Sequence, residues 1–405
     1  MMATTNILLV QHNNEKPKEV VNRLRVIFSG LNTKALTITL WHRLNSDLEN
    51  ELQSDFPTVK FYSSAICNSE SLSRWYQKYQ VGKRMVRSEQ ISLIHCLDIQ
   101  CCQWMNWVSN HCNVPIIADI GFEFAEAHSL PLGIRLMPKL IAPSNNISNA
   151  LKAFGYPCEQ LAVIPSPVSL AEVKSSTTEA LNLKSHFGIR EDEYILINSE
   201  PLVLSSGIDS LIQALSSVRV AQPNVHLVLL GQGEERCQLE QQAMLLNMKE
   251  FVHFVKSSDD HSPYLAQADV YISGARKEGA RPHILTAGQN RLPSIAPMIG
   301  SNPECIRQGI TGFLALAHSH VSISEAIEMM TADPDRLSYF SEQAYFFAQR
   351  LSDPKRYGAS LASVYKQEID THFENNDSDH LSPLLNNLGY ITKLLTGSKA
   401  TGGSL

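Results

Sequence analysis

Residues 194–215, YILINSEPLVLSSGIDSLIQAL, contain the pattern that decides the fold. A short apolar run leads through a polar loop to Gly207, where a helical pattern begins. The apolar residues after this glycine recur at helical spacing: Ile208, Leu211, Ile212 and Leu215. The next apolar run, Val225–Leu230, ends in the sequence Gly231-Gln-Gly233. A strand, a helix opened by glycine and a second strand in this order predict a β-α-β unit of a parallel sheet.

The same alternation of apolar runs and helical segments continues in both directions along the chain. The runs before residue 166 are Asn6–Val10, Ala35–Leu40, Ile91–Ile94, Pro115–Ile117 and Leu140–Ala142. Those after it are Tyr194–Asn198, Val225–Leu230, Phe251–Phe254, Val270–Ser273, Ser294–Ala296 and Gly312–Ala315. A segment rich in Ser, Thr and Pro separates the two series. We therefore predict an α/β fold of two doubly wound, Rossmann-like domains that face each other across a cleft.

The predicted domains are residues 1–165 and 166–355, followed by a C-terminal part, 356–405, that returns to the first domain as a helix and ends in an amphipathic tail helix. The 405 residues are 43% hydrophobic and 18% charged, which excludes wholesale disorder. A net charge of −6 speaks against a dedicated nucleic-acid binder. The charge is uneven, with 15 Lys/Arg against 13 Asp/Glu in residues 1–165 and 19 against 27 in the rest.

The first ten residues, MMATTNILLV, lack the basic start and long apolar stretch of a signal peptide. No stretch reaches the 18 apolar residues that a membrane-spanning helix needs, so we expect a cytoplasmic protein with at most peripheral membrane contact. The dipeptides His95-Cys96, Cys101-Cys102 and His111-Cys112 lack the C-x2-C spacing of a zinc site. We expect buried thiols there and no metal.

Five segments of the second half resemble, in order, the C-terminal domain of the family 4 (group 1) glycosyltransferases, which have the GT-B fold. These segments are residues 194–215, 224–235, 250–273, 276–297 and 300–316. Pro303-Glu304 and Thr311–Leu314 are very similar to the end of the family pattern. Residues 91–98, 115–123, 139–155 and 161–169 resemble the first domain of the family more weakly. The resemblance implies transfer of a hexose from a nucleotide sugar to a glycan or lipid-linked acceptor, with retention and without an obligatory metal or other cofactor.

The resemblance also implies a set of site residues. Glu278 would hold the sugar hydroxyls, and the donor-binding residues would be Ser205, Ser206, Gly207, Gly231, Gly233, Phe254, Arg276, Lys277, Gly279, Arg281 and Thr286. On the acceptor side, His12 and Asn13 replace a glycine-rich loop, and His12 is either an acceptor contact or a solvated loop histidine. Asp119 follows a predicted strand and is either a second catalytic candidate or a structural cap.

Three positions depart from the family pattern. Pro201 and Ser206 stand where the family has an Arg and a Lys for the diphosphate, and Thr286 stands where it has a second Glu. Arg276, Lys277 and Arg281 could supply the missing charge. The alternative is a catalytically inactive GT-B subunit that binds glycan or supports a partner glycosyltransferase. A sugar-nucleotide epimerase of the same fold fits the residues around Pro303 less well.

Two helical segments suggest partners beyond the substrates. Arg74–Arg87 interleaves basic residues with Trp75, Tyr76 and Tyr79, which suits either an anionic membrane surface or a solvated helix with its aromatic residues in the core. Leu381–Leu395 has leucines at helical spacing behind Ser382 and Pro383. We expect this second helix to pack on its own domains or on a protein partner.

Overall fold

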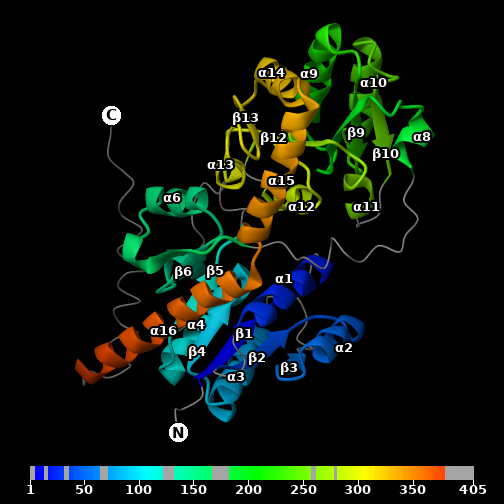
Figure 1. The fold of residues 1–405 in the computed structure, drawn as a ribbon. Helices are drawn as coiled ribbons and strands as arrows, with labels where there is room; N and C mark the ends of the chain where they lie inside the picture. Colours follow the sequence, from blue (N-terminus) through cyan, green and yellow to red (C-terminus); the bar gives the residue numbers. More distant parts are fainter. Residues whose placement is uncertain are drawn as a thin grey trace.

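The computed structural model describes residues 5–12, 17–31, 36–63, 72–121, 132–166, 182–256, 261–277 and 281–378, arranged in two lobes (Figure 1). In the described part of the first lobe, seven parallel strands form a sheet in the order β3 Lys60–Ser63, β2 Leu36–His42, β1 Thr5–Val10, β4 Leu93–Cys96, β5 Ile116–Asp119, β6 Leu140–Ala142 and β7 Leu161–Val163. The helices of this lobe are α1 Pro17–Gly30, α2 Ser46–Asp55, α3 Leu72–Ser88, α4 Ile99–Cys112, α5 Leu132–Arg135 and α6 Asn145–Ala153.

The second lobe repeats this architecture. Its described strands form a parallel sheet in the order β10 Val252–Val255, β9 Val225–Leu230, β8 Tyr194–Asn198, β11 Val270–Ile272, β12 Ser294–Pro297 and β13 Gly312–Ala315. The helices are α8 Leu183–Phe187, α9 Ile208–Ala221, α10 Arg236–Leu245, α11 Ser262–Leu265, α12 Arg281–Gln289, α13 Asn302–Cys305, α14 His320–Thr331 and α15 Pro334–Leu351. Strand order reverses at β1 in one sheet and at β8 in the other, which confirms the prediction of two doubly wound sheets.

The two strands that the sequence did not indicate, β3 and β7, are the edges of the first sheet. Three of the four residues of β3 are exposed, and β7 has no fully buried residue. By contrast, all six residues of β9 are buried, as expected for a central strand of a parallel sheet covered on both faces. These two edge strands lack the continuous buried apolar run on which the prediction depended, whereas the edge strands of the second sheet, β10 and β13, have one.

The chain returns to the first lobe through α16 Pro354–Ser378 (Figure 1). This helix crosses α1 where Gly30 and Gly358 meet, so closely that a Cβ on Gly358 would lie 2.0 Å from the carbonyl oxygen of Gly30. On either side of the crossing, Tyr357 and Tyr365 are buried among the apolar residues of the first lobe. The helix is therefore part of the first lobe's core rather than an appendage.

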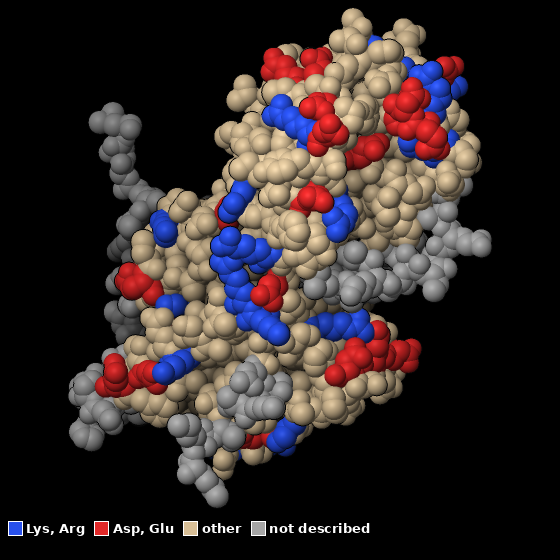
Figure 2. Space-filling view, viewed as in Figure 1, with Lys and Arg blue, Asp and Glu red and all other residues tan. Residues whose placement is uncertain are grey.

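A polar contact also joins the two lobes directly. Glu304 of α13 accepts hydrogen bonds from the backbone N–H groups of Asn145 and Asn146, at 2.9 and 3.3 Å, at the start of α6. A carboxylate at a helix N-terminus is stabilised by the unpaired N–H groups and the helix dipole. Nearby, Lys and Arg side chains gather at the waist between the lobes on the face seen in Figure 2. Among the helices that the structure describes, none is long and apolar enough to cross a bilayer.

Candidate functional site

Glycines bring three loops together at the carboxyl edge of the second sheet. Gly207 follows β8 and opens α9, and a Cβ there would lie 1.9 Å from the carbonyl oxygen of Gly274, after β11. Gly233, after β9, lies equally close to Leu202, since its Cβ would be 2.1 Å from the Leu202 oxygen. Gly231 has a φ of 144°, and a Cβ there would be 3.2 Å from the carbonyl oxygen of Glu200. The predicted residues Gly207, Gly231 and Gly233 thus allow the loops at the carboxyl ends of these strands to pack closely against each other.

Arg276 lies over the beginning of α9. Its backbone N–H donates to the carbonyl oxygen of Ser205 at 2.9 Å, and its guanidinium forms an ion pair with Asp209 in the first turn of the helix. The side chain of Arg276 is 29% exposed. Lys277 beside it is exposed. A cation therefore lies at the loop from which the family's Arg and Lys are missing, although Arg276 already has a carboxylate partner.

The backbone N–H groups of Ser206 and Gly207 are already used within their own loop. The N–H of Ser206 donates to Val203 and that of Gly207 to Leu204, because residues 204–206 form a 3₁₀ turn. Ser206 is also buried, whereas Ser205 is exposed. Of the three predicted residues in this loop, Ser205 is the one with an accessible side chain.

Glu200 is a polar residue of this edge that the sequence did not single out. Its side chain is buried at the end of β8, where Oε1 accepts hydrogen bonds from the Tyr271 hydroxyl at 3.2 Å and from Asn198 Nδ2 at 3.4 Å. Burial raises the pKa of this carboxyl to about 7, although hydrogen bonds from Ser273, Tyr271 and Asn198 oppose the shift. The neighbouring Ser199 Oγ lies 3.2 Å from Nδ1 of His283 on α12. The edge thus holds a carboxyl that changes charge near neutral pH.

Arg281 does not face solvent as a diphosphate ligand would require. Its side chain is 1% exposed, and Nη1 donates to the Cys305 sulfur at 3.3 Å. Thr286 is half-buried on α12, and Phe254 is half-buried beneath the guanidinium of Arg236, 5.5 Å from the ring centre. Glu278, Gly279 and Asn13 lie outside the described residues. Their predicted roles remain predictions, as does a role for Arg281.

At the carboxyl ends of the strands of the first sheet, side chains rather than glycines make the contacts. His12 follows β1, and its backbone N–H donates to the Asp98 carboxylate, 2.5 Å away. Its ring nitrogen Nε2 lies 3.1 Å from Nζ of Lys78 on α3. Burial and the Lys78 charge lower the pKa of His12 to about 4, so the ring is neutral at pH 7. His12 is thus a half-buried, partnered residue rather than a solvated loop histidine.

Asp119 is buried and engaged at the end of β5. Its Oδ1 lies 3.0 Å from His95 Nε2, and its Oδ2 pairs with Arg23 of α1. Burial alone would raise the pKa of Asp119, but His95 and Arg23 outweigh it, and the pKa lies below its usual range. On the other side of the ring, His95 Nδ1 lies 2.8 Å from the Tyr365 hydroxyl of α16. These contacts favour the structural alternative for Asp119 over the catalytic one.

Sequence comparison identifies the second domain. Residues 181–346 match the sequence model of a family described as glycosyl transferases group 1. The predicted resemblance is confirmed. The chain is 25% identical over 195 residues to the putative glycosyltransferase EpsD of Bacillus subtilis, covering 48% of this chain and 51% of that protein. It is 26% identical over 162 residues to the N-acetyl-alpha-D-glucosaminyl L-malate synthase of Bacillus anthracis, covering 40% and 42%. The chain thus spans about half the length of these curated relatives.

Solved structures confirm the GT-B fold across both lobes. A glycosyltransferase from Rickettsia africae superposes with a TM-score of 0.75 at 14% identity, covering 90% of this chain and 99% of that one. HepE from Anabaena in complex with UDP superposes with a TM-score of 0.70 at 16% identity, covering 90% and 100%. At such identities the likeness establishes the arrangement of the elements and leaves the ligand open.

Other predicted features lie outside the group 1 site or outside the described residues. On α3, the Trp75 and Tyr79 rings stack at 5.8 Å, and Trp75 meets Trp107 of α4 edge-on at 5.7 Å. Tyr76 and Trp107 are 57% and 47% exposed, so these aromatic residues form a partly exposed surface. The tail Leu381–Leu395 is not described. Within the described residues, no cluster of three or more His, Cys, Asp or Glu is placed to hold a metal ion.

Proposed function

We propose that this protein is a glycosyltransferase that moves a hexose from a nucleotide sugar to a glycan or lipid-linked acceptor, with retention, in cell-surface polysaccharide biosynthesis. The observation that carries the proposal is the glycine-built edge of the second sheet within the group 1 domain, residues 181–346. Support for the donor comes from HepE, which binds UDP and UDP-glucose on the same fold. Support for a glycolipid acceptor comes from a relative in Streptococcus pneumoniae that is an alpha-monoglucosyldiacylglycerol synthase.

Arg276 is the proposed cation for the diphosphate. A transferase of this kind has to stabilise negative charge that develops on the leaving phosphate. Pro201 and Ser206 supply no charge, whereas Arg276 lies on the same loop assembly with its guanidinium partly exposed. A bound diphosphate would compete with Asp209 for that guanidinium, and the planar fork suits phosphate oxygens.

Nucleotide binding tests the proposal. Calorimetric titration with UDP and GDP should detect one of them, and Arg276→Met should weaken that binding by about tenfold or more, as expected for loss of a charge-assisted hydrogen bond. The matched control is Arg190→Met, which removes an exposed arginine of the same domain that pairs with Glu193. Equal weakening in both variants would reject the role of Arg276.

The alternative is an inactive GT-B subunit that binds glycan or supports a partner. Pro201 and Ser206 favour it, because Ser206 is buried and Pro201 carries neither charge nor a backbone donor. The two proposals differ in one measurement. A subunit without a donor site would bind neither UDP nor GDP. A transferase would bind one of them and would transfer or hydrolyse the sugar of the corresponding nucleotide sugar, releasing that diphosphate.

The aromatic surface of α3 and α4 supports peripheral contact with an anionic membrane. Trp75 and Tyr76 share α3 with basic residues, Trp75 contacts Trp107 of α4, and amphipathic aromatic rings favour the membrane interface. Sedimentation with vesicles containing anionic lipid should fall when Lys83, Arg84 and Arg87 are neutralised together. Unchanged sedimentation would reject the membrane contact without affecting the donor site.

A further inference from the structure

Aromatic side chains of α3 and α4 form a surface in the first lobe, away from the proposed donor site. Trp75 of α3 stacks on Tyr79 at 5.8 Å and meets Trp107 of α4 edge-on at 5.7 Å, and Tyr76 lies 6.3 Å from Tyr79. We refer to these four residues as the aromatic surface. Although Trp75 and Tyr79 pack against the core of the lobe, Tyr76 and Trp107 are 57% and 47% exposed. Exposed apolar side chains that gather in one place typically mark a binding surface.

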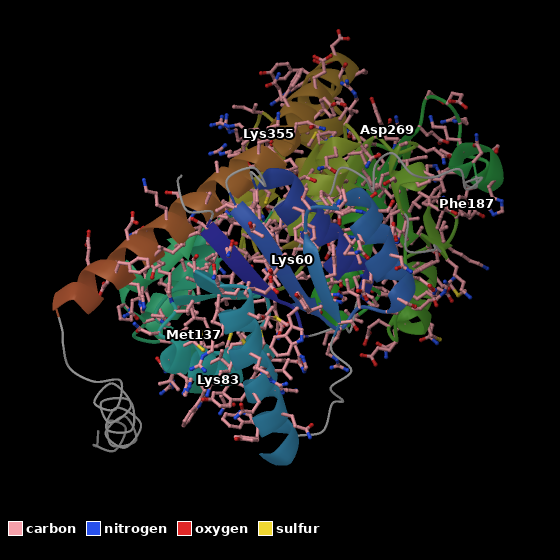
Figure 3. All side chains as sticks on the ribbon, turned by 90° about the horizontal axis from the view of Figure 1, so that it is seen from below. Lys60, Lys83, Met137, Phe187, Asp269 and Lys355 are labelled. Carbon is pink, nitrogen blue, oxygen red and sulfur yellow. The ribbon has the colours of Figure 1, made fainter. Side chains whose placement is uncertain are left out.

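The helix α16 brings the end of the described chain to this part of the first lobe. It begins across the first sheet from α3, as Lys355 and Lys83 show in the view from below (Figure 3). Near its other end, His372 Nε2 lies 3.1 Å from the carbonyl oxygen of Asn113, the residue that ends α4. At a rise of about 1.5 Å per residue, Trp107 lies about 9 Å from Asn113 along α4. The chain beyond α16 therefore starts close to the aromatic surface.

The charges at the end of α4 complement those of the chain that follows α16. Nη2 of Arg87 lies 3.4 Å from His111 Nε2, and burial together with the charges of Lys83 and Arg87 lowers the pKa of His111. Two cations therefore lie beside the last turn of α4. Among the described residues, no carboxylate forms an ion pair with either of them. Carboxylates occur in the last turns of α16 and just after it, at Glu374, Asp377 and Asp379.

The sequence beyond α16 has an apolar stripe that needs a surface to cover. Its members recur at helical spacing: Leu381, Leu384, Leu385, Leu388, Ile391, Leu394 and Leu395. A helix with such a stripe is stable in water only when the stripe packs against another element. The opposite face has a single charge, at Lys393, whereas helices that lie in a membrane interface are rich in basic residues there. A helix over residues 381–395 would be about 22 Å long, which is enough to reach Trp107 from the end of α16.

We propose that residues 379–395 fold back onto the first lobe as a helix, with the leucine stripe on the aromatic surface and the carboxylates of Asp377 and Asp379 beside Lys83 and Arg87. The covalent link favours this segment over a separate protein, because a tail that starts next to its binding surface is present there at a high effective concentration. The cover rests on the sequence of the tail and the position of α16, and it is independent of the proposed transferase. Its competition with a bilayer rests on the membrane contact proposed above.

Nuclear magnetic resonance of the full chain tests the cover, because four tryptophans give four indole N–H signals. The spectrum of Trp107→Phe identifies the Trp107 signal by its loss. Leu384→Asp combined with Leu388→Asp, the stripe variant, places two charges in the apolar stripe and should shift the Trp107 signal by releasing the tail. The Trp104 signal comes from a ring buried in the core of the first lobe and should stay in place.

The matched control places two charges at the same spacing on the opposite face of the tail. Asn386→Asp combined with Tyr390→Asp should leave the Trp107 signal where it is in the parent chain. The proposal is overturned if the stripe variant leaves this signal unmoved, if the control moves it equally, or if the Trp104 signal moves with it. A Trp107 signal that changes on about tenfold dilution of the parent chain would also overturn it, because the tail would then come from a second copy.

Sedimentation with phosphatidylcholine vesicles that contain phosphatidylglycerol separates the cover from the membrane contact. If the tail covers the aromatic surface, the stripe variant should sediment more than the parent chain, and the control should match the parent. Less sedimentation of the stripe variant would mean that the tail itself enters the bilayer, which overturns the proposal. If neither chain sediments while the Trp107 signal shifts, the cover stands and the membrane contact is rejected. Binding of UDP and GDP should be the same in all three chains, so a failure of the donor proposal leaves this test unaffected.

Discussion

The carboxyl ends of the strands occupy equivalent places in the two similar domains. Backbone contacts at glycines form this edge in one domain, and side chains form it in the other. In the second domain, Gly207 and Gly233 let backbone segments meet at distances that no side chain would permit. In the first domain, Trp41, Trp104 and His12 fill the equivalent edge with rings. A backbone-built edge has a fixed shape that suits a ligand shared by a family. A side-chain-built edge can be changed one residue at a time, which suits a ligand that differs between members.

The largest expected effect comes from breaking the backbone contact between Gly207 and Gly274. Gly207→Ala places a Cβ 1.9 Å from the Gly274 oxygen and also forces a side chain into the left-handed region, at a φ of 60°. We expect a loss of about 3–5 kcal/mol in unfolding free energy, from left-handed strain together with overpacking. Urea denaturation of the variant measures it.

Gly188→Ala is the matched control for this effect. Gly188 ends α8 with a φ of 67°, and a Cβ there would meet nothing within 4 Å. It should therefore show the left-handed strain alone, about 1–2 kcal/mol. If the two variants lose the same stability, the contact between Gly207 and Gly274 contributes nothing and the comparison of the two edges fails.

Glu200 gives the next largest effect, and its sign depends on pH. Burial raises the pKa of Glu200 from 4.5 to about 7, so the folded protein favours the neutral carboxyl. The associated stability is fully present below pH 4.5 and is lost as the pH rises through 7. At pH 8, Glu200→Gln should therefore be more stable than the parent by about 2–3 kcal/mol, with little difference at pH 5.

Thermal unfolding at pH values from 5 to 8 measures this difference. Glu234→Gln, at an exposed position after β9, is the control for removing one carboxyl from the same edge. Its unfolding temperature should follow that of the parent at every pH. A parallel pH profile for Glu200→Gln and the parent would show that Glu200 is charged in the folded protein at all these pH values.

The sequence predicted the backbone-built edge better than the side-chain-built one. Strands β8 and β9 begin and end at the predicted residues, because a central parallel strand is one unbroken apolar run in the sequence. The edge strand β13 also has its predicted bounds, since three of its four residues are buried. Gly207 and Gly231 were predictable because a glycine after such a run typically marks a turn or a close approach of two backbone segments. The fold and the close backbone contacts can therefore be predicted from local sequence patterns, namely apolar runs and the glycines that follow them.

The rest depends on contacts between residues far apart in the chain. Glu200 is buried by Tyr271, which is 71 positions away, so its raised pKa has no local signal. The ring of Trp104 on α4 meets those of Trp41 on β2 and of His12 after β1, which lie 63 or more positions away. Arg281 follows a predicted phosphate loop, but its burial against Cys305 depends on how α13 packs. Nothing in the spacing of these residues predicts their contacts.

The smallest expected effect is at the contact between the two domains. Glu304→Ala removes the carboxylate that accepts from the N–H groups of Asn145 and Asn146 at the start of α6, and should cost about 0.3–1 kcal/mol. Hydrogen exchange gives the sharper measurement. The Asn145 and Asn146 amides should exchange faster, while the Ile147 amide, which donates to Ser144 Oγ at 3.2 Å within the first domain, should not change. Faster exchange at Ile147 as well would mean that α6 itself frays, and that the Glu304 carboxylate stabilises the start of this helix rather than the contact between the two domains.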